Sequence, residues 1–115
     1  MAGQLRQVNL EQGLPTVEQA LRRLDSELIT SKRLGYAAVK LIHGYGSSGT
    51  GGKIRVAVRR ELSARKARGQ ITGFVPGEKF SIFEEETRQA LRCCDALRSD
   101  RDLERYNNGV TFVIL

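Results

Sequence analysis

The part of the sequence best suited to chemistry is a histidine followed by a glycine-rich loop, HGYGSSGTGGK, at residues 43–53. Glycines allow successive backbone N–H groups to converge on one point, and the N-terminus of a following helix adds partial positive charge there. Lys53 adds a full positive charge at the end of the loop. This combination predicts a site for a phosphate group, although a flexible linker that needs glycine only to turn tightly would have the same composition.

Neither of the two common nucleotide-binding motifs fits this loop. Residues 44–49 match the pattern GxGxxG, but a dinucleotide-binding fold usually needs a second βαβαβ half, for which 115 residues leave no room. The acidic residue expected about 20 positions later could only be Glu78, beyond a turn. As a P-loop, the segment has Ser47 in place of the first glycine and Ile54 in place of the magnesium-binding hydroxyl residue.

The chain contains one histidine, His43, which we expect at the carboxyl end of a strand, where α/β folds bind ligands. Its imidazole is a candidate general acid or base, or a phosphate ligand, and a purely structural histidine is an equal alternative. A single histidine cannot supply a two-histidine acid/base pair, and no metal ligands are predicted. Tyr45 would either stack on a base or close the loop.

Positive charge is concentrated just after the loop. Nineteen Lys and Arg against thirteen Asp and Glu give the chain a net charge of +6, and residues 51–70 hold seven of these cations with one acid, Glu61. Such a patch favours a polyanionic partner such as nucleic acid, whereas the alternative is a solvated basic face that aids solubility. The side chains and loop positions predicted to bind nucleic acid are Gly44, Tyr45, Gly46, Lys53, Arg55, Arg59, Arg60, Arg65 and Lys66.

Strands and helices alternate along the sequence. Apolar spacing predicts strands at residues 7–10, 37–42, 71–75 and 110–115, and helices from Thr16 to near Gly35, from Lys53 to about Arg68, and over 83–97. Thr16-Val17-Glu18-Gln19 and Ser81-Ile82-Phe83-Glu84 both have the form of a capping box, which opens a helix. A short helical turn near 100–106 is expected before the terminal strand.

This order predicts an α/β fold, a two-layer sandwich of β-α-β-α-β-α-β order in which helices cover a small mixed sheet. Helical crossovers make the early strands parallel. The length fits one domain, residues 1–115, with an added helical segment at about 81–106.

Composition excludes several classes of protein. The chain is too short for a multidomain enzyme, and it has neither an apolar run long enough to cross a bilayer nor a secretory stretch, so we expect a cytoplasmic protein without a membrane partner. Cys93 and Cys94 are adjacent, which rules out a CxxC site, and we interpret both as reduced core thiols.

Three motifs resemble those of the Smr domain, the small MutS-related module, and the resemblance covers nearly the whole chain. His43, Gly44 and Gly46 match the family's HGxG motif, and TVEQA at residues 16–20 matches the start of its first helix. The last strand carries the GxTxVxL-like pattern at Gly109, Thr111, Val113 and Leu115. The resemblance implies binding to nucleic acid, often branched or structured, and in several members endonucleolytic cleavage of DNA or RNA.

One motif departs from the family pattern. Where the family has LDLHG, this chain has VNLEQG: Asn9 replaces the aspartate, Glu11 stands in place of the histidine, and Gln12 is inserted before Gly13. A carboxylate beside a phosphate site would repel the scissile group unless it acts as a base or holds a metal. The candidate catalytic residues are therefore His43 and Glu11; no cofactor is evident, and Mg²⁺ would be expected only of a nuclease.

The leading hypothesis is a protein that binds structured DNA or RNA through the HGxG loop and the basic helix. A structure-selective nicking endonuclease that uses His43 and Glu11 is the second hypothesis, and a non-catalytic binding or adaptor module that recruits partners is the alternative to it. A membrane-surface module is the least favoured, because the narrow apolar stripe of the basic helix is needed by the core. The sequence does not distinguish DNA from RNA or set the oligomeric state.

Overall fold

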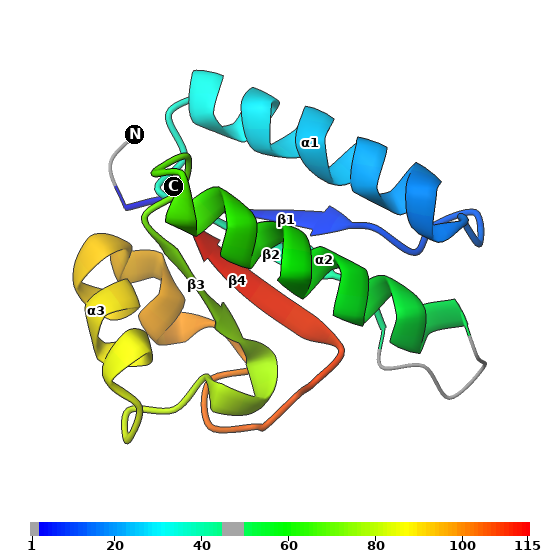
Figure 1. Ribbon diagram of the computed structural model, residues 1–115. Coiled ribbons are helices and arrows are strands. Elements are labelled where there is room, and N and C mark those ends of the chain that lie inside the picture. Colours follow the sequence, from blue (N-terminus) through cyan, green and yellow to red (C-terminus); the bar gives the residue numbers. More distant parts are fainter. Residues whose placement is uncertain (1–2, 45–49) are drawn as a thin grey trace.

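The structure, a computed structural model, describes residues 3–44 and 50–115. Strands and helices alternate as predicted, from the N-terminal strand to the C-terminal one (Figure 1). The elements are β1 (Leu5–Asn9), α1 (Val17–Arg33), β2 (Ala38–Ile42), α2 (Thr50–Ala67), β3 (Gly73–Pro76), the 3-10 helix η1 (Gly77–Lys79), α3 (Glu85–Cys93), the 3-10 helix η2 (Asp95–Ser99) and β4 (Val110–Ile114). No helix within these residues is long and apolar enough to cross a membrane.

The strands form one mixed sheet in the order β1-β2-β4-β3. β1 and β2 are parallel, as the α1 crossover requires, whereas β4 runs antiparallel to both β2 and β3. The C-terminal strand therefore lies inside the sheet, between strands that come from the middle of the chain (Figure 1). Its residues are all buried, which explains the unbroken run of β-branched and aromatic side chains in VTFVI.

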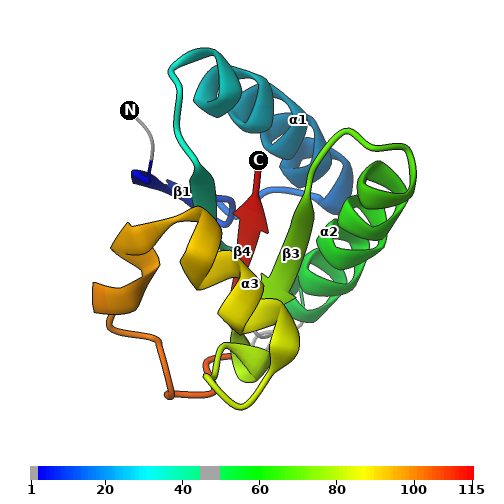
Figure 2. The ribbon, with the colours of Figure 1, turned by 90° about the vertical axis from the view of Figure 1, so that its left-hand side faces the viewer.

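Helices α1 and α2 pack side by side on one face of the sheet. Together with the sheet they form the two-layer sandwich that the sequence predicts. Its core contains Leu24 and Leu28 of α1, Val58 and Leu62 of α2, and Val113 of β4. The added segment lies on the other face, where α3 and η2 form a partial third layer (Figure 2). A second core there is built around the stacked rings of Phe80 and Phe112, whose centroids are 4.0 Å apart.

The first helix begins as its capping box predicts. Thr16 is the N-cap, and its hydroxyl oxygen accepts a hydrogen bond from the backbone N–H of Gln19 at 3.1 Å. The Gln19 side-chain oxygen accepts in turn from the Thr16 backbone N–H at 2.9 Å. This reciprocal pair satisfies two backbone groups that the helix itself leaves unpaired.

The second predicted capping box is wrong. Helix α3 begins at Glu85 rather than near Ser81, with Glu84 as an N-cap that makes no side-chain hydrogen bond. Ser81 is instead buried below the helix, where its backbone N–H donates to the hydroxyl of Thr87 and its own hydroxyl accepts from the Phe83 N–H. Phe83, the first residue of the predicted helix, lies outside α3 and is 81% exposed. Tertiary burial of Ser81 thus replaces its local capping role.

The adjacent cysteines occupy different environments. Both are free thiols; Cys94 is buried as predicted, but Cys93 is exposed, so its assignment to the core is wrong. Helix α3 ends between them, and this turn directs the two side chains apart. Burial raises the pKa of the Cys94 thiol, which keeps it protonated and inert.

A buried ion-pair cluster attaches the added segment to the sheet. Lys40, in the middle of β2, is 3% exposed and points toward the added segment. Its ammonium group lies 2.6 Å from a carboxylate oxygen of Asp102 and 3.1 Å from both oxygens of Asp100. Burial would raise the pKa of Asp102, but hydrogen bonds from Lys40 and Asn107 hold it below its ordinary value. The cluster therefore fixes residues 100–107 against the sheet.

Replacing Lys40 should be costly, because it leaves two buried carboxylates without a cation. We expect Lys40→Met to lower the free energy of unfolding in urea by about 3 kcal/mol. Adding Asp100→Asn and Asp102→Asn to that variant should restore part of the loss. Lys53→Met, a matched change at an exposed position, should change stability by less than about 0.5 kcal/mol. A loss of under about 1 kcal/mol in Lys40→Met would show that the cluster contributes little.

Candidate nucleic-acid interface

His43 follows the last residue of β2 and lies beneath the start of the glycine-rich loop. The side chain is fully buried, at 0% exposure. Its Nδ1 atom lies 2.7 Å from the carbonyl oxygen of Gly44, and its Nε2 atom lies 2.8 Å from the hydroxyl oxygen of Thr111 in β4. Both ring nitrogens are therefore engaged inside the protein.

The partners of His43 define which way each hydrogen bond runs. A carbonyl oxygen only accepts, so Nδ1 carries the proton and donates to Gly44. In the neutral ring Nε2 then accepts, and it receives the Thr111 hydroxyl proton. Arg59 completes the chain, because its Nε donates to the same Thr111 oxygen at 3.1 Å. We call this series, from Arg59 through Thr111 and His43 to the Gly44 carbonyl, the histidine relay.

The surroundings of His43 keep its ring neutral. The pKa of His43 is lowered from 6.5 to about 4, mainly by burial, and the positive charges of Arg59 and Arg55 contribute to this lowering. The hydrogen bond to the Gly44 carbonyl and the charge of Glu78 act in the opposite direction. Protonation would also require Nε2 to donate to Thr111, reversing the relay. At neutral pH the imidazole is thus uncharged, and its hydrogen bond to the Gly44 carbonyl holds the start of the loop in place.

Gly44 joins the histidine relay to the neighbouring strand ends. Its φ of +77° lies in the left-handed region that glycine tolerates best, and a Cβ atom there would collide with the Glu11 carboxylate. The backbone N–H groups of His43 and Gly44 both donate to the carbonyl of Gly109, each at 3.0 Å. The NNG turn before β4 and the start of the loop are therefore held together. The other predicted loop positions, Tyr45 and Gly46, lie outside the described residues.

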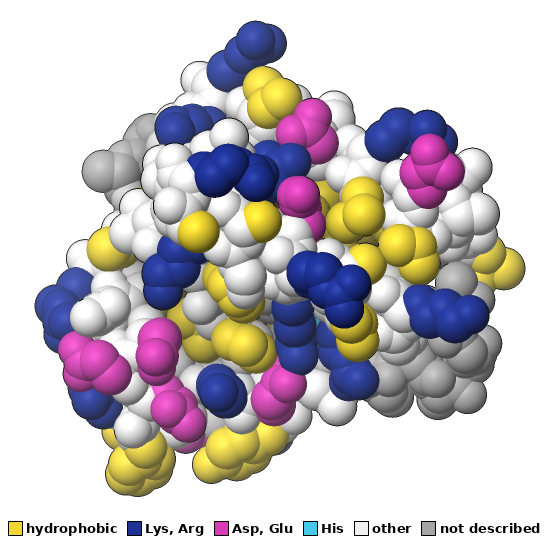
Figure 3. Space-filling model, in the orientation of Figure 1, with side chains coloured by type: hydrophobic (Ala, Val, Ile, Leu, Met, Phe, Trp, Pro, Cys, Tyr) yellow, Lys and Arg dark blue, Asp and Glu magenta, His cyan; other side chains and the backbone are white. Residues whose placement is uncertain are grey.

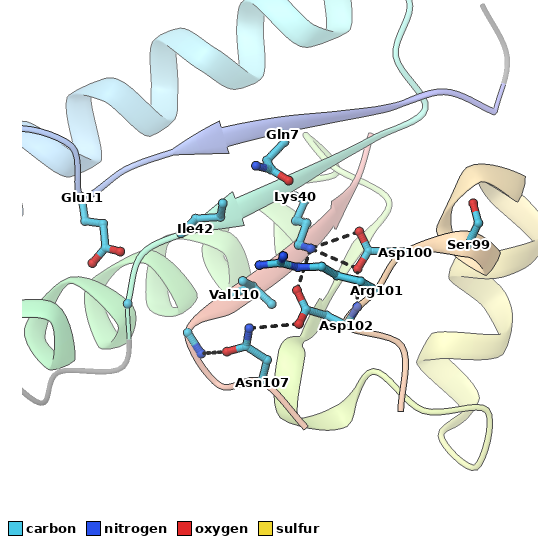
Figure 4. Close-up of a pocket in the computed structure, with 12 residues that line it drawn as sticks. Gln7, Glu11, Lys40, Ile42, Ser99, Asp100, Arg101, Asp102, Asn107 and Val110 are labelled. Carbon is cyan, nitrogen blue, oxygen red and sulfur yellow. Dashed lines mark hydrogen bonds and ion pairs between the residues drawn. The ribbon is translucent and has the colours of Figure 1, made fainter. Parts of the chain in front are cut away.

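The altered motif places Glu11 against the loop. Asn9, which stands where the family has aspartate, accepts a hydrogen bond on its side-chain oxygen from the Glu11 backbone N–H at 2.9 Å. Glu11 is exposed, and its carboxylate packs on Gly44. Glu11 and Gly44 line a pocket of about 480 Å³ on the face of the sheet that carries the added segment. Figure 4 shows Arg101 extended across this pocket, with Glu11 on its far side.

The basic helix α2 carries both paired and unpaired cations. Arg59 makes a two-pronged ion pair with Glu78 of η1, both contacts at 2.7 Å, and also donates to the Val110 carbonyl. Partial burial would raise the pKa of Glu78, but the Arg59 hydrogen bonds lower it below its ordinary value. Arg65 pairs with Asp25 of α1 at 2.7 Å. These two arginines hold the fold together.

The other predicted cations of α2 have no such partners. Within residues 3–44 and 50–115, no ion pair involves Lys53, Arg55, Arg60 or Lys66. Lys53, Arg60 and Lys66 are exposed. Arg55 is half-buried, and its positive charge is close enough to lower the pKa of His43. Figure 3 shows Lys and Arg side chains gathered over α2, with acidic groups between them. The free positive charge therefore lies next to the loop and along the outer side of α2.

Sequence reasoning missed the partners that make this site rigid. The sequence offers Glu78 only as a poorly placed ribose ligand and Thr111 only as part of a strand motif. A polar residue inside an otherwise apolar strand was the available signal for both Lys40 and Thr111. Nothing in the sequence indicated that Glu78 pairs with Arg59, because the two residues are joined only by the fold.

The described residues contain no group of three or more His, Cys, Asp and Glu side chains placed to hold a metal ion. Glu11 is a single carboxylate at the loop, and Asp100 and Asp102 are already occupied by Lys40. These residues do not fit a protein-held metal centre.

Comparison with known proteins identifies the fold. The family model of the Smr domain matches residues 12–115. The crystal structure of the Smr domain of Thermus thermophilus MutS2 is similar to this chain, with a TM-score of 0.60, 25% sequence identity and coverage of 96% of each chain. A search of the curated proteins gives no match.

The histidine relay makes a testable statement about protonation. Since His43 is the sole histidine, the NMR signals of its two ring C–H groups are assigned without ambiguity, and we expect them to titrate near pH 4 rather than near 6.5. Between these values the unfolded chain binds a proton that the folded chain does not, so stability falls as the pH is lowered. The loss attributable to His43 should be about 2 kcal/mol between pH 7 and pH 5. A midpoint near 6.5 would mean that the ring is accessible to water.

Proposed function

Because this chain belongs to the Smr domain family, we propose that it binds structured or branched DNA or RNA through the loop after His43 and the basic helix α2. The observation that carries the proposal is the separation of the helix cations into two sets. Arg59 and Arg65 form internal ion pairs, whereas no ion pair within the described residues involves the other predicted cations of α2, of which Lys53 and Arg55 lie in the turns next to the loop. A protein that needed positive charge only for folding would have no reason to leave them free.

The phosphate backbone is the part of a nucleic acid that such a surface fits. Helix α2 follows the loop directly, so the positive end of its dipole and the N–H groups of its first turn point toward the loop. Lys53 and Arg55 add full charges within the first turns. With few aromatic residues in the chain, recognition should follow backbone shape more than base sequence.

Salt dependence tests the phosphate contacts. We expect the double variant Lys53→Gln with Arg55→Gln to bind a branched DNA duplex at least about fivefold more weakly in low salt. Its log–log salt slope should be shallower than that of the wild-type protein by about 1.8, since each lost contact removes about 0.9. Fluorescence anisotropy in a series of salt concentrations measures both quantities.

The matched control is Lys32→Gln with Arg33→Gln. This pair removes the same charge from exposed positions at the end of α1, which precedes the start of β2 and so lies at the opposite edge of the sheet from the loop. It should leave the slope unchanged. An equal loss in both double variants would mean that net charge, rather than this surface, drives binding.

Nicking endonuclease activity is the second candidate, and one arrangement favours it. The exposed Glu11 carboxylate and the Arg101 side chain line the same pocket beside Gly44. In the proposed step Glu11 takes a proton from water, and the water oxygen attacks phosphorus. The bond from phosphorus to the leaving oxygen breaks, and solvent protonates that oxygen. Arg101 offsets the charge that develops on phosphate, and His43 acts only by positioning Gly44.

Glu11→Gln separates the two candidates, because it removes the base and also a negative charge beside the phosphates. On end-labelled branched DNA and hairpin RNA with Mg²⁺, we expect the wild-type protein to nick and Glu11→Gln to lose all nicks on a denaturing gel. Its binding should tighten a few fold, as a like charge is removed. His43→Asn should reduce nicking through loss of loop position. Binding without nicks in the wild-type protein would leave a non-catalytic binding or adaptor module.

A further inference from the structure

Beyond α2, a second surface with exposed arginines surrounds the C-terminal part of the added segment. A hollow of about 680 Å³ is lined by Arg101, Asp102, Arg105, Tyr106, Asn107 and Asn108. Three of these residues, Arg101, Asp102 and Asn107, also line the pocket that contains Glu11 and Gly44. The two hollows are thus adjacent, and together they extend from the loop to Tyr106. We call them the side groove.

The side groove holds cations that the protein does not use for itself. Arg88, Arg92 and Arg98 of the added segment are each paired with a nearby carboxylate. Arg101 and Arg105 are exposed, and neither takes part in an ion pair within the part of the chain that the structure describes. Asp100 and Asp102 are paired with Lys40, and the Glu104 carboxylate accepts a hydrogen bond from the Ile82 N–H. The exposed charges at this end are therefore those of Arg101 and Arg105.

Tyr106 lines the side groove and lies in a turn with strained backbone angles. Its φ is +55° and that of Glu104 is +65°, a region that bulky side chains avoid. Neighbouring contacts hold the turn in place: the Glu104 N–H donates to the Phe80 carbonyl at 3.0 Å, and the Glu104 carboxylate accepts from the Ile82 N–H at 2.7 Å. The result is a tyrosine that is 62% exposed, with Arg105 next to it. Strain of this kind persists only where surrounding structure enforces it, and it accompanies binding sites.

We propose that the side groove binds an unpaired segment of nucleic acid that leaves the duplex held at the loop. Tyr106 stacks on a base, and Arg101 and Arg105 bind the phosphates on either side of it. A paired base has its faces covered by its neighbours in the stack, so an exposed ring of this kind selects single-stranded nucleotides. The inference rests on the proposed function, and it names the substrate class as a duplex with a flap, fork or loop.

The test compares one DNA duplex with and without a six-nucleotide single-stranded overhang. For the wild-type protein we expect the overhang to tighten binding by about tenfold, in the range that one stacked base and two phosphate contacts produce. Tyr106→Asn removes the ring but suits the left-handed backbone. In this variant the gain in affinity from the overhang should be at least about fivefold smaller than in the wild-type protein. Arg105→Gln should lose a similar share. Thermal unfolding confirms that each variant folds.

Two control variants make the result specific. Tyr106→Phe keeps the ring and should keep the gain, whereas Arg98→Gln removes one charge from η2 outside the groove and should change nothing. An overhang that adds nothing in the wild-type protein while the blunt duplex binds would overturn the inference and leave the proposed function standing. So would a gain that survives in both Tyr106→Asn and Arg105→Gln. No binding to either DNA, in low salt, would overturn the proposed function itself.

Discussion

The hydrogen-bond series that ends on the Gly44 carbonyl is the interaction on which the rest of this structure depends. It joins α2 through Arg59, β4 through Thr111 and the end of β2 through His43. Glu78 extends it to η1 by its paired contacts with Arg59. Elements that are distant in sequence are thereby fixed at the start of one loop. Since buried polar groups are costly unless each has its partner, loss of any member would leave the next one unsatisfied.

This arrangement changes the meaning of the histidine in the HGxG motif. A conspicuous single histidine next to a phosphate-binding loop suggests acid/base chemistry, but here its ring is buried and both nitrogens are engaged. The group exposed at the same place is Glu11, which the altered early motif supplies. The buried histidine and the exposed carboxylate thus follow the ends of the two parallel strands, β2 and β1.

A second division separates cations that build the fold from cations that face solvent. Lys40, Arg59 and Arg65 form ion pairs with carboxylates of other segments, and each pair joins two parts of the fold. Among the described residues, the cations that form no ion pair include those of α2 and the two arginines of the turn at 101–105, which lie on opposite faces of the sheet. The buried Lys40 cluster connects the two regions, because its ion pairs hold Asp100 and Asp102 of the added segment against β2. A duplex on one face and its unpaired strand on the other would be read by different parts of the same domain.

Local patterns in the sequence determined the element order, the Thr16 capping box, the mixed sheet and the family motifs, because periodicity and capping depend on neighbours along the chain. The same reasoning failed at Ser81, where burial overrode a capping pattern, and it placed Cys93 in the core. Only the tertiary structure decided that Arg59 and Arg65 are neutralised, that the His43 ring is buried and neutral, and that Arg101 lines one pocket with Glu11 and another with Tyr106. The physical reason is that ion pairs and burial are set by residues brought together across the sheet, and their separation in the sequence carries no sign of that contact.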